Sequence, residues 1–581
     1  MRALVAIAVT LLLIAQLPSA DASRSARGSS SSLEGLTIAL VHGVDHGAAP
    51  ARLASLAQDR AGALLAAMAS DPARALRAAL PDDVAAALPD GAPAEAAVDL
   101  EGTILLLHAD GARRSIDSWR LATDGGDEVV LHFAAPTELQ PGERARVTGL
   151  RLGQDMAVAA ADGDGTGTVA AASAAAPVAK KVLVLMFKFP GQADPWSADA
   201  VRKEVFTGSS SANAYWTDSS FGLLSLTGNL RPDGDVAGPY VINSTNSACS
   251  SNYKTWSNAA RAAAQADGWD LGGYDHFVYA FKSSGCPGSG WAYISASDSW
   301  VISMTSYVVA HELGHNFGLH HASSYRCTDG GVAVAISSAC TASEYGDPFD
   351  VMGTTKRINN NFQKGRLGFF GSSNTVDATT SGVYTIAPVE APTDAPQAVR
   401  VARTTSQSYY LEFRQPWGTF DSFAATDPVV RGVSLRLGPG YATLAKPLLL
   451  DATPSTSSFT DGALLADRWL YDAVKNITFH TLSVGPEGAQ VEVTIGALPC
   501  TRAAPGVAVS PSSAWAEAGQ TVQYTMTITN LDAPSCAAAD FHLEGVLPEG
   551  WSQSLATSVV SLAPGASATV QVAVTSAADA A

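Results

Sequence analysis

Apolar residues recur along the chain with two different periods, and the change of period divides the sequence into regions. Residues 61–88 carry apolar side chains at helical spacing, and Pro72 and Pro81 are expected to divide them into separate short helices. Residues 128–158 instead alternate between apolar and polar side chains in short runs, which predicts strands. The N-terminal region is therefore expected to be helical first and then β-rich.

A second structured region follows a stretch of low complexity at residues 157–179, which we interpret as a linker. Residues 182–187 form a continuous apolar run typical of a buried strand, and residues 275–281 form another. Helices are expected at residues 198–206, with Ser197 as N-cap, and at residues 258–266. This mixture of strands and helices predicts an α/β-type layer.

The rest of the chain favours β structure. Alternating runs predict strands at residues 397–403, 409–413, 432–437 and 489–495. From about Cys500 a separate module is expected, because residues 521–529 and 569–574 alternate strictly between turn-forming segments. Short alternating strands with turn signals predict a β-sandwich of the Ig-like kind.

Composition narrows the class of protein. The 581 residues include 36 Lys and Arg against 54 Asp and Glu, which gives a formal charge of −18. Such a chain lacks the basic surface of a nucleic-acid-binding protein. A hydrophobic content of 47% supports buried cores, and the length implies several domains.

The N-terminus has the pattern of an export signal. Arg2 precedes an apolar run at residues 3–15, and Ala20-Asp21-Ala22 fits an A-x-A cleavage site. The apolar run is short for a membrane span of about 20 residues, and no later stretch is long and apolar enough to form one. The sequence therefore predicts a protein that is secreted after removal of residues 1–22.

The cysteine count agrees with export. The six cysteines form no C-x-x-C pair, so disulfides are a better interpretation than a cysteine zinc site. Several pairings are possible, and the order along the chain favours 249–286, 327–340 and 500–536.

The candidate chemistry lies in the segment from His311 to His321. On a helix at residues 306–317, with Thr305 or Ser306 as N-cap, His311 and His315 share one face, about 5–6 Å apart at Cβ. That spacing allows both imidazoles to bind one zinc ion. Gly318 can adopt the left-handed conformation that ends a helix, so that His321 can supply the third nitrogen. The fourth position stays open for water, as a catalytic zinc site requires.

Glu312 is the candidate general base. It follows His311 directly and can take a proton from a zinc-activated water, which then hydrolyses a peptide bond. His320 competes with His321 as third ligand, and the spacing favours His321. With Gly318 and His321 included, the motif arises by chance in only about 2 of 100,000 such chains.

The pattern H-E-x-x-H-x-x-G-x-x-H resembles the signature of metzincin zinc proteases. Met352, in the run Asp350-Val351-Met352-Gly353, resembles the family's Met-turn. Residues 344–353, together with residues 182–187, 215–222 and 409–414, look like the gametolysin-type branch. The resemblance covers roughly residues 180–495, and it implies a metzincin fold, one catalytic zinc ion, endopeptidase activity and extracellular protein or peptide substrates.

Two departures from metzincin patterns concern the metal. Thr354 stands where some metzincins place a tyrosine near the metal, two residues after the Met. Some metzincins also keep their precursor inactive with a propeptide cysteine, but residues 23–248 contain no cysteine. That cysteine switch is therefore absent.

These observations predict an α+β fold with a metzincin domain between a propeptide and β-rich modules. The expected parts are a signal peptide (1–22), a propeptide ending in the linker (23–178), the protease domain (179–395), a β-rich extension (396–498) and an Ig-like β-sandwich (499–581). Residues 291–295 are either a strand that holds substrate by β-augmentation or an ordinary core strand. Two other functions remain open, a non-catalytic adhesion protein and a zinc amidase acting on cell-wall peptides. The sequence leaves cleavage specificity, structural calcium and oligomeric state undetermined.

Overall fold

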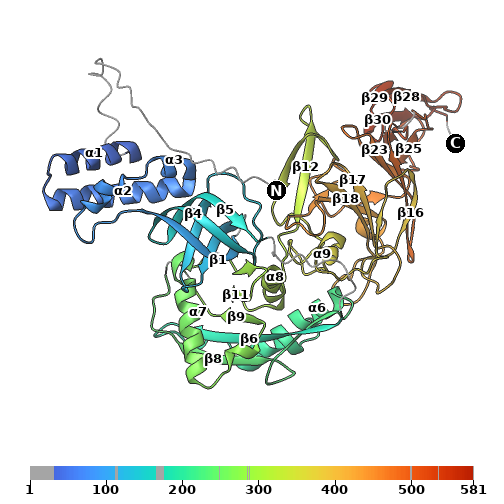
Figure 1. Ribbon diagram of the computed structural model, residues 1–581. Coiled ribbons are helices and arrows are strands. Elements are labelled where there is room, and N and C mark those ends of the chain that lie inside the picture. The colour runs from blue at the N-terminus through green and yellow to red at the C-terminus, as the bar shows by residue number, and fades with distance from the viewer. Residues whose placement is uncertain are drawn as a thin grey trace, which may run out of the picture. The chain divides into compact units, whose positions relative to one another are not determined.

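The computed structural model describes residues 32–111, 115–164, 176–247, 249–283, 285–286, 288–497, 500–533 and 535–579 (Figure 1). The predicted signal peptide, residues 1–22, lies outside them. The chain divides into two compact units. The first contains the residues up to Gly102, Arg120–Leu139 and Ala145–Gly163, and the second contains Thr103–Trp119, Gln140–Arg144 and the chain from Asp164 onward.

The helices of the first unit are separated where prolines were expected to separate them. They are α1 (Leu33–Asp45), α2 (Pro50–Ser70), α3 (Pro72–Arg77) and α4 (Asp82–Ala86). Pro72 opens α3, because a first-turn proline lacks only an N–H that has no helical partner anyway. Asp71 caps the same helix by accepting a hydrogen bond from the N–H of Arg74.

The strands between residues 96 and 163 show that the linker predicted at residues 157–179 was placed too early. They are β1 (Ala96–Ala109), β2 (Ile116–Thr123), β3 (Glu128–Phe133), β4 (Arg144–Leu152) and β5 (Asp155–Gly163). β5 pairs antiparallel with β4, and Ala157 and Val158 are buried, so residues 157–163 are not a linker. Small alanines that pack inside a sheet resemble low-complexity sequence, which explains the error. Residues 165–175 lie outside the described residues.

A mixed sheet forms the centre of the second unit. Its strands run in the order β10 (Gly290–Ile294), β11 (Asp298–Val301), β9 (His276–Ala280), β6 (Val178–Lys188) and β7 (Leu224–Thr227), and β8 (Asp235–Val241) also pairs with β6. Alternate residues of β6 enter two different cores: Val182, Val184 and Met186 one, and Leu183, Leu185 and Phe187 the other. Burial on both faces explains its continuous apolar run.

Helices cover both faces of this sheet. They are α5 (Ala198–Arg202), α6 (Ala212–Ser219), α7 (Cys249–Ala266) and α8 (Ser306–Asn316). The short helix α9 (Asn361–Arg366) instead contacts β18 (Ser408–Phe413) of the C-terminal half. α6 and α8 contribute Trp216 and Leu313 to the first core, whereas α7 contributes Trp256 to the second. Ser197 caps α5 as predicted, and a π-helical turn, Lys203–Thr207, continues it. α7 begins at Cys249, earlier than expected.

The C-terminal half is β-rich, as predicted. One sheet contains β12 (Ser323–Asp329), β13 (Val332–Val334), β14 (Ala339–Ser343), β15 (Thr375–Asp377), β17 (Ala398–Ala402), β18 (Ser408–Phe413), β19 (Gly432–Gly438), β20 (Leu448–Leu450) and β21 (Leu464–Leu465). A second contains β16 (Gly382–Ile386), β22 (Arg468–Asp472), β23 (Ile477–Gly485) and β24 (Gly488–Ile495).

The last residues form two further sheets. One contains β25 (Gly506–Ser510), β26 (Thr521–Thr529), β28 (Ser552–Leu555) and β30 (Ser567–Thr575), and the other contains β27 (Ala539–His542) and β29 (Val559–Leu562). Ile528 and Val570 from the first sheet and Leu562 from the second belong to one apolar cluster. The Ig-like assignment of this part stays a prediction.

The six cysteines form the three predicted disulfides, Cys249–Cys286, Cys327–Cys340 and Cys500–Cys536. Disulfides of this kind persist in oxidising compartments. Among the described residues, no helix is both long and apolar enough to cross a membrane.

Candidate metal centre

Helix α8 carries the first two histidines of the motif. Its N-terminus is capped by Thr305, whose hydroxyl accepts from the N–H of Val308. Gly318 has a φ of 103° just after the helix, the conformation that the sequence required of it. A Cβ on Gly314 would lie only 2.5 Å from the Met352 sulfur, so the absence of a side chain there lets the Met352 loop pack directly against the helix.

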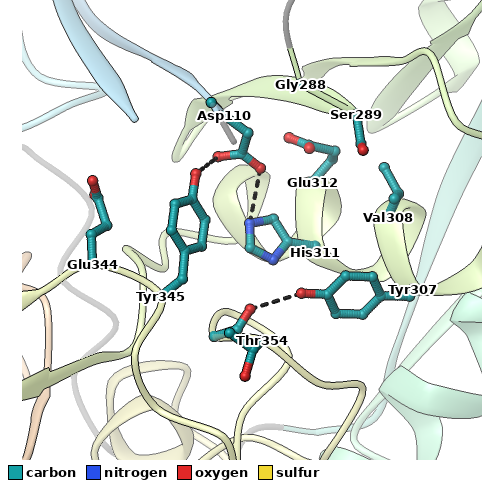
Figure 2. A pocket seen from close by; sticks show the side chains of 12 residues that line it. Asp110, Gly288, Ser289, Tyr307, Val308, His311, Glu312, Glu344, Tyr345 and Thr354 are labelled. Carbon is teal, nitrogen blue, oxygen red and sulfur yellow. Dashed lines mark hydrogen bonds and ion pairs between the residues drawn. The ribbon is translucent and has the colours of Figure 1, made fainter. Parts of the chain in front are cut away.

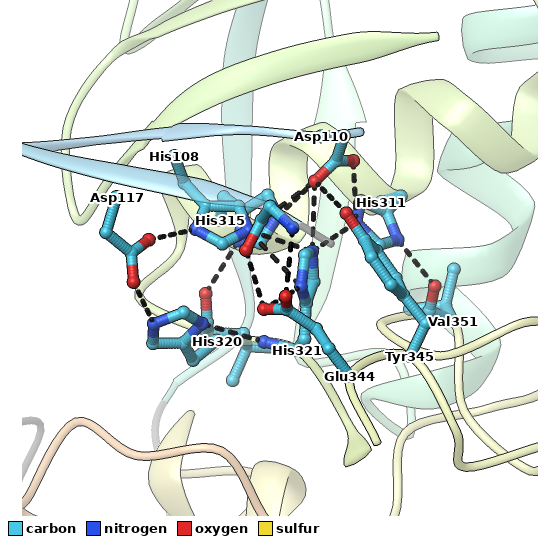
Figure 3. A network of polar contacts seen from close by, with 12 residues as sticks. His108, Asp110, Asp117, His311, His315, His320, His321, Glu344, Tyr345 and Val351 are labelled. Atoms are coloured by element: carbon cyan, nitrogen blue, oxygen red, sulfur yellow. Dashed lines mark hydrogen bonds and ion pairs between the residues drawn. The ribbon is translucent and has the colours of Figure 1, made fainter. Parts of the chain in front are cut away.

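The structure brings His311, His315 and His321 together (Figure 3). The Nδ1 of His311 donates to the Val351 carbonyl at 2.7 Å, and that of His315 donates to the Leu319 carbonyl at 2.9 Å. With Nδ1 protonated, each neutral ring presents the Nε2 lone pair to the centre of the cluster. Burial lowers the pKa of His315 well below its usual value, and the other histidines lower it further, which favours this neutral form.

Glu344 orients His321, a role that no sequence motif indicates. The Glu344 Oε1 lies 3.0 Å from His321 Nδ1 and also accepts from Lys446 at 2.5 Å. A carboxylate on the far nitrogen fixes the tautomer and direction of an imidazole. The pKa of Glu344 is lowered despite partial burial, because it accepts hydrogen bonds from His321, Lys446 and Ser115.

His320 points away from this group. Its Nδ1 accepts from the backbone N–H of His321, and its Nε2 lies 3.5 Å from Asp117 Oδ2. Burial lowers its pKa to about 4. Of the four histidines in the motif region, His311, His315 and His321 therefore face a shared centre, and the choice of His321 over His320 as a ligand stays a prediction.

Glu312 is buried beside the histidines, and its Oε2 has no hydrogen-bond partner in the described part of the chain (Figure 2). Its other oxygen packs against β10, where a Cβ on Gly290 would lie 2.3 Å from Oε1. Burial raises the pKa of the Glu312 carboxyl well above its usual value, and the charge of Asp110 raises it further. A buried carboxyl with a raised pKa and one oxygen without a partner among the described residues is suited to accept a proton.

Two further residues enter the cluster from the N-terminal segment, and sequence analysis missed both. Asp110 places Oδ1 3.0 Å from His321 Nε2 and Oδ2 3.2 Å from His311 Nε2. The Nε2 of His108 lies 3.0 Å from that of His321. Burial opposes ionisation of Asp110, but the charge of His311 and hydrogen bonds from the histidines hold its pKa well below the usual value.

Met352 lies buried beneath α8, as the Met-turn resemblance implied. Asp350 shapes the turn, because its two oxygens accept from the backbone N–H groups of Met352 and Asn360 at 2.8 and 2.7 Å. Burial, followed by the charge of Asp347, raises the pKa of Asp350 to about 7.

The donor set fits a zinc ion. Tetrahedral zinc at 2.0–2.1 Å from nitrogen or oxygen separates its ligand atoms by about 3.3–3.4 Å. His311 Nε2 and His321 Nε2 are 3.3 Å apart, and Asp110 oxygens lie at 3.0–3.9 Å from the three Nε2 atoms. The His315 Nε2 is buried without a partner among the described residues, which leaves a lone pair aimed into a polar site.

A pocket of about 420 Å³ opens beside the cluster (Figure 2). Glu312, His311 and Asp110 form its polar side. Tyr307 and Val308 of α8, together with Gly353 and Thr354 after the Met-turn, also line it. A side chain placed there would lie next to both the histidines and the candidate base.

Comparison with protein families decides the class. Residues 180–416 match the family described as gametolysin peptidase M11. The chain carries a gametolysin M11 metallopeptidase domain. The domain contains β6–β11, α8 and the Met-turn, so it includes every site residue named in the sequence motif.

The match to M11 ends inside the region predicted as a β-rich extension, residues 396–498. Residues 516–581 match the NPCBM-associated, NEW3 domain of alpha-galactosidase, so a NEW3 domain follows the M11 domain near the C-terminus. No curated protein and no solved structure matches the chain.

Proposed function

We propose that the M11 domain is a zinc endopeptidase in which His311, His315 and His321 hold one catalytic zinc ion and Glu312 is the general base. The observation that carries this proposal is the buried, unpartnered Nε2 of His315 beside the Nε2 atoms of His311 and His321. Three neutral imidazoles oriented through their Nδ1 atoms are the ligand set of many catalytic zinc sites.

A zinc ion held by His311, His315 and His321 would supply Lewis-acid polarisation of the scissile carbonyl and would lower the pKa of water toward about 7. Glu312 then takes the proton of the attacking water and passes it to the leaving amine. Its unpartnered Oε2 leaves the carboxylate free for this transfer.

Tyr345 is suited to assist the substrate carbonyl. Its hydroxyl donates to Asp110 Oδ1 at 2.9 Å, and its ring centre lies 3.9 Å from that of His321. A hydroxyl that meets a carboxylate oxygen at this point can equally donate to the oxygen that gains charge when a peptide carbonyl is attacked. Tyr345 would thus supply the donor that Thr354 cannot supply after the Met-turn.

Strand β10 is the proposed substrate strand. It is the last of the M11 domain's own strands in the sheet, beyond β11. An extended peptide can pair with such a strand through backbone hydrogen bonds. That arrangement would bring its scissile bond beside Glu312, which packs against Gly290 of the same strand.

We further propose that the chain is secreted and cut before it becomes active. The three disulfides agree with an oxidising destination. β5 ends at Gly163 and β6 begins at Val178, so a cut that leaves both strands whole falls between them. N-terminal sequencing of the active secreted form tests this, and a fully active enzyme that begins near Ser23 would contradict it.

Metal analysis of the purified chain tests the zinc site directly. We expect one zinc ion per chain and loss of peptidase activity when phenanthroline removes it. His321→Ala should reduce zinc occupancy far more than His320→Ala, because the latter side chain points toward Asp117 instead. Activity that survives without bound metal would contradict the proposal, and cleavage of cell-wall peptides but not proteins would favour an amidase.

A further inference from the structure

Strand β1 pairs with the strand that we propose for substrate. Its last residues run antiparallel to β10, with Leu106 opposite Ile294 and Ala109 opposite Trp291. Leu107 is buried in the same core as Trp291, whereas His108, one position further on, faces the opposite side of the sheet. Strand pairing and core packing therefore set the position of this segment in the uncleaved chain.

The chain leaves β1 directly over the histidines. Asp110 follows the strand and lies 3.0 and 3.2 Å from the Nε2 atoms of His321 and His311, and 3.9 Å from that of His315. Its Oδ1 also accepts from the Tyr345 hydroxyl (Figure 3). No other described carboxylate comes within 4 Å of all three Nε2 atoms.

Neighbouring contacts fix the segment in this position. Asp117 hydrogen-bonds Nδ1 of His108, so that His108 Nε2 faces the cluster. Beyond Asp110, Ser115 donates through its N–H and hydroxyl to Glu344, at 2.9 and 2.6 Å. Glu344 is the same carboxylate that orients His321, so one side chain ties the segment to a proposed zinc ligand.

We propose that Asp110 is the fourth ligand of the zinc ion in the uncleaved chain and that β1 at the same time fills the peptide-binding edge of β10. The proposal rests on the zinc endopeptidase function proposed above. An anionic oxygen at the fourth position displaces the water that hydrolysis needs, and a strand paired with β10 excludes an extended substrate. The uncleaved chain is therefore latent through an aspartate, which accounts for the cysteine-free N-terminal region.

The test uses the full chain with Glu312→Gln, which prevents self-cleavage and leaves the proposed ligands intact. Cobalt replaces zinc, and the visible absorption of cobalt reports whether acetohydroxamate, a small bidentate ligand, reaches the metal. We expect Asp110→Ala to bind acetohydroxamate at least about tenfold more tightly than the parent chain, because the position is open in the whole population. Asp99→Ala is the matched control, since Asp99 lies on the same strand and pairs with the exposed Arg146.

A second arm examines the strand. A recognition site for a specific protease is inserted between Gly163 and Val178, and the chain is cut. We expect the N-terminal fragment to leave the M11 domain in size-exclusion chromatography, with acetohydroxamate binding rising to the level of Asp110→Ala. A fragment that stays bound with the metal closed would overturn the proposal that β1 is a removable occupant.

The outcomes separate this proposal from the one on which it rests. Equal acetohydroxamate affinity in the parent, Asp110→Ala and Asp99→Ala chains would overturn the role of Asp110 and leave the zinc site standing. Absence of stoichiometric metal from all three chains would instead overturn the zinc endopeptidase itself. Asp110→Asn, which keeps the side-chain volume, replaces Asp110→Ala if the latter fails to fold, and it should show the same opening. A larger opening with His108→Ala than with Asp110→Ala would mean that the wrong residue was assigned.

Discussion

Helix α8 and strand β1 bring polar side chains to the same point by different physical means. On α8, His311 and His315 share a face through helical spacing, and carbonyls of neighbouring loops hold their Nδ1 atoms. His108 near the end of β1 is positioned by the strand pairing with β10 and by the carboxylate of Asp117, and Asp110 follows directly after the strand. One set belongs to the M11 domain itself, and the other set comes from outside it.

The difference separates the proposed permanent zinc ligands on and after α8 from the proposed removable ligand, Asp110. Side chains on α8 cannot leave the centre without unfolding the helix, whose apolar residues fill the core. β1 is joined to the M11 domain by chain that a single cut can interrupt, and its pairing with β10 uses an edge that a substrate can occupy instead. The three histidines would thus be in place in both the uncut and the cut chain, whereas the fourth metal position would be open only in the cut chain.

Removal of a proposed zinc ligand from α8 should have the largest effect on zinc content and activity. His315→Ala is expected to remove zinc from cut and uncut chains alike and to lower kcat/KM by more than about 10⁵-fold, because the metal supplies much of the rate acceleration. Asp110→Ala should leave zinc content unchanged in both forms. Metal analysis beside peptide turnover checks this, and a His315→Ala chain with full zinc would remove His315 from the ligand set.

Glu312→Gln comes next and separates base from ligand on the same helix. The amide keeps the shape of the carboxylate but accepts no proton from water, so kcat should fall by about 10²–10⁴-fold. Zinc content and melting temperature should stay near wild type, since Glu312 is not a zinc ligand in the proposed arrangement. Near-normal turnover would assign the proton transfer to another residue.

The helix and the strand also differ in what their sequences could predict. Spacing predicted α8, an N-cap at Thr305 or Ser306 and the turn at Gly318, and the structure confirms the helix, Thr305 and the turn, because each depends on residues close along the chain. The choice of His321 over His320 as a ligand also rests on spacing, and it stays a prediction. The disulfide pairs followed from their order. The metzincin resemblance led to Met352, and the M11 match bears out the family.

What the sequence could not predict depends on contacts between distant segments. His108 and Asp110 lie about two hundred positions from the motif, at and just after the end of a strand whose alternation does not reveal its partner strand. Glu344 and Tyr345 were noticed only as part of a family pattern, because their roles appear when the chain folds back over His321. Residues 159–163 of β5, Ala-Ala-Ala-Asp-Gly, lack the β-branched and aromatic side chains that usually mark a strand, so this part of β5 was taken for a linker.

Substitution of Gly290 on β10 should have a smaller effect, because it displaces the proposed base Glu312 without removing its carboxylate. A Cβ on Gly290 would lie 2.3 Å from Glu312 Oε1, the end of a side chain that can move, so Gly290→Ala should fold with nearly normal stability and displace the carboxylate. A misplacement of about 1 Å can cost about 10²-fold in rate, which is the loss in kcat that we expect. Gly440→Ala is the control, because a Cβ there meets nothing within 4 Å. Unchanged kcat in Gly290→Ala would argue that the position of Glu312 matters little.

Tyr345→Phe should give the smallest of these effects. It tests the residue whose hydroxyl would exchange Asp110 for the substrate as its partner after cleavage. The hydroxyl that donates to Asp110 in the uncut chain is proposed to donate to the substrate carbonyl in the cut enzyme. A zinc ion shares that stabilisation, so we expect kcat to fall by only about tenfold, the equivalent of about 1.4 kcal/mol, with little change in KM. Zinc content should not change, because the hydroxyl is not among the proposed ligands. Tyr471→Phe, which removes a hydroxyl bonded to Asn476 far along the chain, should leave turnover unaffected. A tenfold rise in KM at constant kcat would instead show that Tyr345 holds the substrate in its ground state, and the developing charge would then depend on the metal alone.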